Sequence, residues 1–311
     1  MSYSLTLTRD HDGRRLDRTL RSVWPALPLS AIMRALRKGE VRVDAVRVRE
    51  PGMRVRAGQE LHVPWEAPGA RPRVQRHSSV PILWEGATAW ILDKPSGLLV
   101  QPDVKGGDSV VSRAWSMAES RGIDGSVAAV HRLDRNTTGA LIVAIRGDAL
   151  RALELLFKER RVGKRYLALV AGRAPDEALI DAPLLKDAET ELVRPSPQGK
   201  EARTRCRRIA GDGEMSLVSV ELLTGRTHQA RVHLAHIGHP IIGDRKYGRT
   251  RDGAWPSRRP LLHAFELTFP EDLPNPIDDM SGMTVRAPVP GDMCVVASSH
   301  GMDLTELEGA L

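Results

Sequence analysis

The chain has 311 residues, of which 41% are hydrophobic and 27% are charged, and it carries a net charge of +7. At roughly 100–200 residues per domain, this length predicts two domains. Two cysteines, Cys206 and Cys294, are too few for a disulfide framework and favour a reducing, cytoplasmic setting. No apolar run approaches the roughly 20 residues that span a bilayer, and residues 1–12 lack the apolar core of a signal peptide.

The positive charge is concentrated at the N-terminal end. Residues 1–65 contain 13 Lys/Arg and 7 Asp/Glu, a net of +6, whereas the rest of the chain nets +1. A small basic module on a nearly neutral body indicates binding to a polyanion. A solubilising surface would produce the same asymmetry, so charge alone leaves both interpretations open.

The N-terminal module predicts a compact α/β unit. Apolar residues over 16–24 recur at helical spacing, and Ser30 is a candidate N-cap for a second helix that ends before Gly39. Four valines over 41–48 alternate with polar residues on either side of a short turn, which predicts a hairpin. A last strand is expected around Leu61.

The segment from Gly13 to Pro64 resembles an S4 RNA-binding domain. The matching pieces are Arg15-Leu16-Asp17, Leu36-Arg37-Lys38-Gly39-Glu40-Val41-Arg42-Val43 and Ala57-Gly58-Gln59-Glu60-Leu61. The resemblance implies a domain over residues 1–65 whose basic charge binds RNA. The basic side chains of the second helix and the hairpin are the candidate RNA contacts, namely Arg34, Arg37, Lys38 and Arg42.

Residues 66–80 are rich in Pro, Gly, Ser and Arg without apolar periodicity, which predicts a linker. Residues 81–311 then form the expected catalytic domain, in which strands predominate. Strands are predicted at 89–92, 140–145, 166–170 and 217–223, and helices at 148–161 and 227–237. Because the helices do not alternate regularly with the strands, we expect an α+β domain around a mixed, mainly antiparallel sheet.

One stretch, from His131 to Gly139, carries the most chemical information. It reads His-Arg-Leu-Asp-Arg-Asn-Thr-Thr-Gly and leads into an apolar strand. Asp134 lies between Arg132 and Arg135, whose positive charge favours an ionised carboxylate. An ionised aspartate can act as a nucleophile. A structural network of Arg and Asp at a strand end would give the same pattern, and without further information it is the more frequent explanation.

The same stretch resembles the signature of the RluA family of pseudouridine synthases, His-Arg-Leu-Asp-Arg/Lys-x-Thr-Ser-Gly. Thr138 replaces the usual Ser, which keeps the hydroxyl, and Ala230 replaces a usual Ile. The resemblance extends over about residues 81–288. Three further segments resemble family motifs in the same order, namely Ile-Leu-Asp-Lys-Pro-Ser-Gly at 91–97, Lys-Arg-Tyr-Leu-Ala-Leu-Val at 164–170 and Thr-Gly-Arg-Thr-His-Gln-Ala-Arg-Val-His at 224–233.

The resemblance implies a role for four residues. Asp134 matches the catalytic aspartate, and Tyr166 matches a tyrosine that packs on the target base. Arg226 matches the arginine that pairs with the catalytic carboxylate, and Arg132 matches one that moves toward the duplex when the base leaves it. From the residues alone, Tyr166 would be a half-buried core residue and Arg226 a turn residue.

No cofactor is expected, because converting uridine to pseudouridine is redox-neutral and requires no ATP. A cluster of histidines raises a metal-binding alternative, but no nearby carboxylate or cysteine completes a clear ligand set, so we predict no metal. These histidines are His228, His233, His236 and His239.

The predicted substrate is 23S ribosomal RNA, and the chain is expected to act as a monomer without an obligate protein partner. The S4-like module and the segments 182–186 and 199–202 resemble the large-subunit ribosomal branch of the family. A transfer RNA synthase of the same family is one alternative. A non-catalytic S4-type RNA-binding or ribosome-assembly protein is another, and the intact Asp134, Tyr166 and Arg226 disfavour it.

Overall fold

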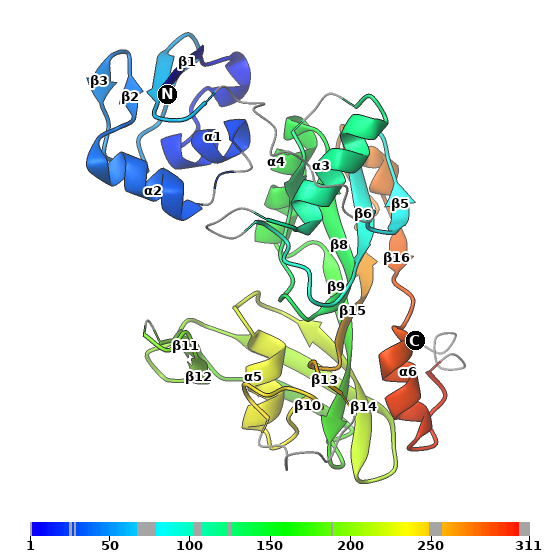
Figure 1. Ribbon diagram of the computed structural model, residues 1–311. Helices are drawn as coiled ribbons and strands as arrows, with labels where there is room; N and C mark the ends of the chain where they lie inside the picture. Colours follow the sequence, from blue (N-terminus) through cyan, green and yellow to red (C-terminus); the bar gives the residue numbers. More distant parts are fainter. Residues whose placement is uncertain are drawn as a thin grey trace.

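The computed structural model describes residues 2–24, 27, 29–66, 79–102, 107–123, 126–187, 189–248 and 257–304. Two main sheets carry the fold, one near the N-terminus and a larger one in the rest of the chain (Figure 1). The predicted linker lies almost wholly outside the described residues. No helix in these ranges is both long and apolar enough to cross a membrane.

The N-terminal sheet has four strands in the order β1-β4-β2-β3. Its elements are β1 (Tyr3–Thr6), the 3-10 helix η1 (Arg9–His11), α1 (Leu16–Val23), α2 (Leu29–Lys38), β2 (Arg42–Val43), β3 (Val46–Arg47) and β4 (Glu60–Val63). Both predicted helices and the predicted hairpin are confirmed, but α2 begins at Leu29, so Ser30 lies inside the helix and the prediction that it is the N-cap is wrong. Strand β1 was not predicted, because only two of its four residues are apolar.

The hairpin between β2 and β3 turns at Asp44 and Ala45, which have positive φ angles of 49° and 65°. Positive φ at both central residues defines the type I′ turn, whose twist matches that of the flanking strands. Leu16, Leu36 and Leu61 are fully buried in a core that belongs to this module alone. The module therefore has an apolar interior of its own.

The larger sheet has ten strands, eight of them in the order β10-β13-β14-β9-β15-β8-β6-β5, with β16 paired to β15 and β7 paired to β8. Among the strands that the structure describes, β8 and β15 are the one parallel pair, which confirms the predicted mixed, mainly antiparallel α+β architecture. A separate small sheet joins β11 (Leu184–Lys186) to β12 (Val193–Pro195). The large-sheet strands are β5 (Ile82–Glu85), β6 (Ala89–Lys94), β7 (Ala128–Ala129), β8 (Thr138–Ala144), β9 (Gly163–Ala171), β10 (Glu177–Asp181), β13 (Arg203–Gly211), β14 (Met215–Leu222), β15 (Leu262–Thr268) and β16 (Thr284–Arg286).

Helices cover both faces of this sheet (Figure 1). They are α3 (Val110–Ser120), α4 (Gly147–Lys158), α5 (Gln229–His236) and α6 (Gly291–Ser298), with a 3-10 turn η2 (Asp278–Met280). Alternate residues of β6 and β8 enter two different cores. Leu92 and Leu141 pack with α3 and α5, whereas Ile91 and Ile142 pack with α4. On β9, Leu167 faces the core that contains α6.

Gly139 fixes the start of β8. It has a φ of 108°, and a Cβ atom there would lie 2.2 Å from the carbonyl oxygen of Ala264 on β15. Any side chain at this position would push the two parallel strands apart. Since the 131–137 loop leads directly into β8, this close approach also fixes where that loop ends.

Candidate active site

Asp134 lies in the loop before β8, whose seven residues are all buried. The buried side chain of Leu133 anchors the loop, and the Thr137 N–H donates to the Asp134 carbonyl at 3.1 Å. The Asp134 side chain is 21% exposed. A rigid strand therefore presents a partly exposed carboxylate.

Lys94 fixes the backbone of this loop through hydrogen bonds. Its side chain is fully buried at the end of β6, and its Nζ donates to three carbonyl oxygens, of Pro95 at 2.9 Å, Arg135 at 2.9 Å and Thr137 at 2.8 Å. Burial lowers the pKa of Lys94 to about 7, while the charge of Asp134 acts in the opposite direction. When protonated, the ammonium supplies one donor for each carbonyl.

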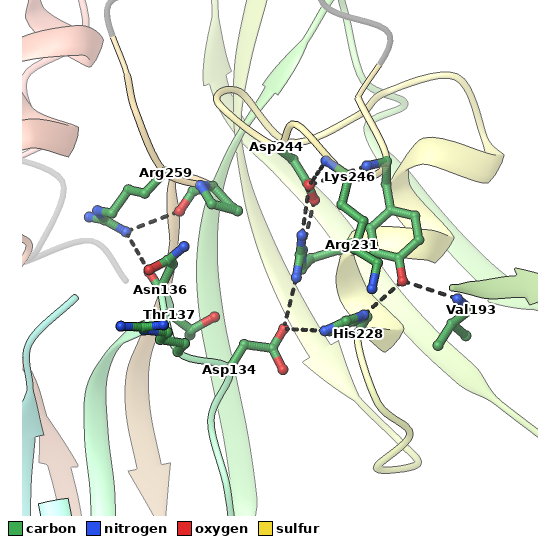
Figure 2. A network of polar contacts seen from close by, with 12 residues as sticks. Asp134, Asn136, Thr137, Val193, His228, Arg231, Asp244, Lys246 and Arg259 are labelled. Atoms are coloured by element: carbon green, nitrogen blue, oxygen red, sulfur yellow. Dashed lines mark hydrogen bonds and ion pairs between the residues drawn. The ribbon is translucent and has the colours of Figure 1, made fainter. Parts of the chain in front are cut away.

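Arg259 holds the same loop from the side of α6 (Figure 2). Its Nε and Nη2 each lie 2.6 Å from the Asp292 carboxylate, and its Nη1 donates to the Asn136 carbonyl at 3.4 Å. Arg259 is only 7% exposed, whereas the Asp292 side chain is 48% exposed, so the bidentate pair anchors a buried guanidinium to a carboxylate at the surface. The loop after Asp134 is thus connected to a helix more than 150 residues further along the chain.

The hydroxyl of Thr138 has a specific partner in the interior. His263 Nε2 lies 3.3 Å from the Ala287 carbonyl, which requires a proton on that nitrogen. Its Nδ1 is then an acceptor for the Thr138 hydroxyl at 2.9 Å. Burial lowers the pKa of His263 to about 4, so the ring is neutral near pH 7. The hydroxyl group that Thr and Ser have in common therefore makes a specific hydrogen bond at this position.

Arg231 of α5 makes the ion pair with Asp134. Its Nη1 is 3.3 Å from Asp134 Oδ2, while its Nε and Nη2 each donate to Asp244 at 2.7 Å (Figure 2). Arg231 is 9% exposed and Asp244 is fully buried. The Asp244 carboxylate thus fixes the guanidinium that contacts Asp134.

The predicted ion pair between Arg226 and Asp134 is wrong. Arg226 Nε donates to the Glu201 carbonyl at 2.8 Å. The residue precedes α5, whereas Arg231 lies on the helix face that turns toward Asp134. The two arginines lie five positions apart in one sequence motif. Their side chains point in different directions because α5 begins between them, at Gln229, so that Arg231 is on the helix and Arg226 is not.

Tyr166 lies on β9, with a side chain that is 7% exposed and packs in the core beneath α3 and α5. Burial raises the pKa of the phenol, and the nearby Asp134 charge raises it further. The ring remains a neutral phenol at pH 7. Tyr166 is thus both the core residue that its apolar strand predicts and a wall of the cavity that contains Asp134.

A cavity of about 1330 Å³ joins the catalytic sheet to the N-terminal module. Asp134, Tyr166, Arg132 and Arg226 all line it, and Arg21 Nη2 donates to Gln101 Oε1 at 3.1 Å across the two parts. The lining contains eleven Lys/Arg and two acidic residues, Asp134 and Glu154. The basic ones are Arg14, Arg15, Arg18, Arg21, Arg54, Arg132, Arg151, Lys158, Arg160, Lys164 and Arg226.

The four basic residues chosen from the S4 resemblance lie elsewhere. Arg34, Arg37, Lys38 and Arg42 are exposed but do not line this cavity. The basic side chains that α1 and its approach contribute line it instead. Their role as RNA contacts stays a prediction.

Three of the four histidines in the 228–239 segment, namely His228, His233 and His239, have separate hydrogen-bond partners. His233 is fully buried, with Nδ1 2.8 Å from Thr204 Oγ1 and Nε2 2.9 Å from the Ala182 carbonyl. His239 Nδ1 lies 3.0 Å from the Ala171 carbonyl. Within the ranges that the structure describes, no three His, Cys, Asp or Glu residues gather in a way that could hold a metal ion.

Comparisons with known proteins agree with this geometry. Residues 88–236 match the family described as RNA pseudouridylate synthase. Ribosomal large subunit pseudouridine synthase C of Vibrio cholerae is 36% identical over 85% of this chain and 88% of its own length, and the Escherichia coli protein of that name is 35% identical over the same shares. The structure of human RNA pseudouridylate synthase domain containing 1 aligns with a TM-score of 0.58 and 25% identity over 76% of this chain and 97% of the human one.

Proposed function

This chain belongs to the RNA pseudouridylate synthase family and is an isomerase that acts on RNA, and we propose that it converts specific uridines of 23S ribosomal RNA to pseudouridine. The observation that carries the proposal is the Asp134 carboxylate, held by Arg231 and facing a basic cavity beside Tyr166. The Vibrio cholerae and Escherichia coli relatives, which match over most of their own length, are named ribosomal large subunit pseudouridine synthases, and this supports the choice of RNA.

In the proposed reaction Asp134 is the nucleophile. Pseudouridine formation breaks the N1–C1′ bond, rotates the uracil and joins C5 to C1′. Pairing with Arg231 limits the rotation of the carboxylate. The other contacts on the loop, from Lys94 and Arg259, hold the backbone that presents it.

The target base has to leave the helix before Asp134 can reach it, which costs a few kcal/mol. Tyr166 offers a flat ring at the cavity wall, and stacking on it allows the uracil to rotate without losing a particular hydrogen-bond register. Arg132 is exposed at the cavity edge, where it can bind phosphate or enter the space that the base vacates. Arg226 lines the same wall and is proposed to bind the substrate, although it does not hold the carboxylate.

The RNA is proposed to pass between the N-terminal module and the catalytic sheet. Eleven basic side chains line this space and would contact phosphates on both sides of the target nucleotide. Residues 1–65 then act as an S4-type RNA-binding domain, residues 66–80 as a linker and residues 81–311 as the catalytic domain. We propose that the protein works as a monomer in the cytoplasm, where its ribosomal substrate is made.

The test is pseudouridine mapping of total RNA from cells that lack the protein and are rescued with either the wild type or Asp134→Asn. We expect specific 23S uridines to lose the modification and only the wild type to restore it. Asp148→Asn is the matched control, because Asp148 pairs with Arg146 at the surface and should tolerate the same change.

Other outcomes would choose between the alternatives. If a transfer RNA position responds and the 23S sites do not, the reaction stands and the proposed substrate is wrong. If no site responds, the protein is an RNA-binding or assembly protein. Purified Asp134→Asn should still bind RNA, and loss of binding together with activity would make Asp134 a structural residue.

A further inference from the structure

We propose that His228 is a positioning residue for Asp134, and that Tyr247 fixes the imidazole proton on Nε2, the nitrogen that faces the carboxylate. The inference rests on the proposed role of Asp134 as nucleophile. Under this proposal His228 positions the nucleophile, whereas the metal-binding alternative gave this histidine no role in the reaction.

The imidazole of His228 lies between Asp134 and Tyr247, and Figure 2 shows its contact with Asp134. Its Nε2 lies 3.8 Å from Asp134 Oδ2, and its Nδ1 lies 2.7 Å from the Tyr247 hydroxyl oxygen. The His228 side chain is only 18% exposed. Each ring nitrogen therefore has one defined neighbour.

The hydrogen bonds of the Tyr247 hydroxyl determine which nitrogen of His228 carries the proton. The backbone N–H of Val193 donates to the Tyr247 hydroxyl oxygen at 3.1 Å. The hydroxyl proton itself has one acceptor among the residues that the structure describes, which is His228 Nδ1. A neutral imidazole that accepts at Nδ1 carries its proton on Nε2.

The surroundings keep this imidazole neutral. Burial lowers the pKa of His228, and the positive charges of Arg231 and Lys246 lower it further. Asp134 and Asp244 act in the opposite direction. A protonated ring would also carry hydrogen on Nδ1, and the Tyr247 proton would then lose its acceptor.

The arrangement distinguishes the two oxygens of the Asp134 carboxylate. Arg231 Nη1 lies 3.3 Å from Oδ2, the same oxygen that His228 Nε2 faces. No described residue donates a hydrogen bond to Oδ1, so Oδ1 is the oxygen presented to the cavity. The 3.8 Å separation is longer than a hydrogen bond. Catalytic contacts of this kind commonly shorten when the substrate binds.

The backbone at His228 is an independent sign of constraint. Its φ of 55° and ψ of 19° place a non-glycine residue in the left-handed region immediately before α5. Such a conformation persists only where surrounding contacts hold it, and it is frequent at functional sites. The contact from Tyr247 to Nδ1 is one that holds the side chain in place.

Tyr247 is anchored to the hairpin of β11 and β12. Besides the bond from Val193, the Nζ of the neighbouring Lys246 donates to the Glu191 carbonyl at 3.0 Å. The Arg231 guanidinium lies 5.0 Å from the centre of the Tyr247 ring. A displacement of this hairpin would therefore reach Asp134 through both of its partners.

Three variants test the proposal by steady-state kinetics on an RNA substrate. His228→Ala should lower kcat by about tenfold or more, because a charged acceptor loses a donor, and should leave the KM for RNA nearly unchanged. His228→Gln places an N–H near the position of Nε2 and should recover most of the loss. Tyr247→Phe should lower kcat by about threefold to tenfold. The control is His236→Ala, which changes an exposed histidine at the end of α5 and should behave as wild type.

A second measurement does not depend on activity. In the ¹⁵N spectrum of the imidazole near pH 7.5, His228 should show a protonated Nε2 and an unprotonated Nδ1, and Tyr247→Phe should remove this preference. A protonated Nδ1 in the wild type would overturn the assignment. If the wild type is active and His228→Ala has the same kcat, the assignment is also overturned. If the wild type is inactive, the result contradicts the proposed function instead.

Discussion

The N-terminal module and the catalytic sheet use their charged residues in different ways. In the module, four of the five arginines that line the cavity are exposed, namely Arg15, Arg18, Arg21 and Arg54. In the sheet, Lys94, Arg231 and Arg259 are each less than 10% exposed and have fixed partners. Exposed charges attract RNA as a group, so they are individually replaceable, whereas each buried charge has a geometric task of its own.

The largest effect should come from Arg231, near the start of α5. Arg231→Lys cannot reproduce the fork that joins Asp134 to Asp244. We expect kcat to fall by about 100-fold, since misplacing a reacting group by an ångström has effects of this size. Stability should fall by up to about 3 kcal/mol, because the buried Asp244 loses a partner.

Arg226→Lys is the matched control for this change. Its guanidinium bonds only a backbone carbonyl among the described residues, so kcat should change less than about fivefold. Single-turnover rates and urea denaturation of both variants measure the difference. If Arg226→Lys is the more damaging of the two for the rate, the ion pair described here is not the one that operates during turnover.

The positive charges of the module can be tested as two sets of equal size. Replacing Arg14, Arg18 and Arg21 by Gln removes three charges from the cavity wall, and replacing Arg34, Arg37 and Lys38 removes three from α2. The first set should reduce the slope of log affinity against log salt by about 2, since each phosphate contact contributes about 0.7–0.9. The second set should change the slope less. Equal changes would place both helices on the RNA.

Thr138 offers a smaller test inside the catalytic sheet. Thr138→Val removes the hydroxyl and leaves the Nδ1 of buried His263 without its donor, which should lower stability by about 1–3 kcal/mol. Thr138→Ser keeps the hydroxyl and should retain activity, as the family motif implies. Thermal and urea denaturation compare the two, and an equally stable Val variant would show that the hydroxyl is not required.

The smallest effect should appear as a dependence on pH. The folded-state pKa of His263 is about 4, below the ordinary value of 6.5, so the unfolded chain binds a proton that the native state does not. The stabilisation is fully present above pH 6.5 and decreases as the pH falls toward 4. Between pH 6.5 and 5.5 it should fall by about 1 kcal/mol. His263→Gln should flatten this part of the urea-denaturation profile, and an unchanged profile would contradict the burial of a neutral ring.

Much of the fold follows from local patterns in the sequence. The apolar run at 140–145 and the helical spacing at 148–161 correspond closely to β8 and α4. Periodicity identified them because their side chains pack locally. Strand β1 has a weak apolar pattern and is defined mainly by its pairing with β4, about 55 residues away. The residues of β1 themselves contain little information about a partner at that distance.

The site was only partly predictable for a related reason. Asp134 stands in a contiguous motif, so its position could be inferred directly. Arg231 and His228 lie in a second motif whose side-chain directions depend on where α5 begins. The sequence around Lys94 contains a signal for its structural role, because a lysine at the end of an apolar strand needs a buried partner. The sequence around Arg259 contains no such signal, since its contacts with the loop form only in three dimensions.

The long-range anchors of the catalytic loop also have a consequence for the order of synthesis. The N-terminal module has its own core and leaves the translation machinery first. The loop around Asp134 is completed only by His263, and by Arg259 held by Asp292, more than 120 residues later. A nascent chain thus gains a basic, folded module long before it gains a competent nucleophile. Under the proposed role of the module, binding to RNA can begin while the chain is still incapable of modifying it.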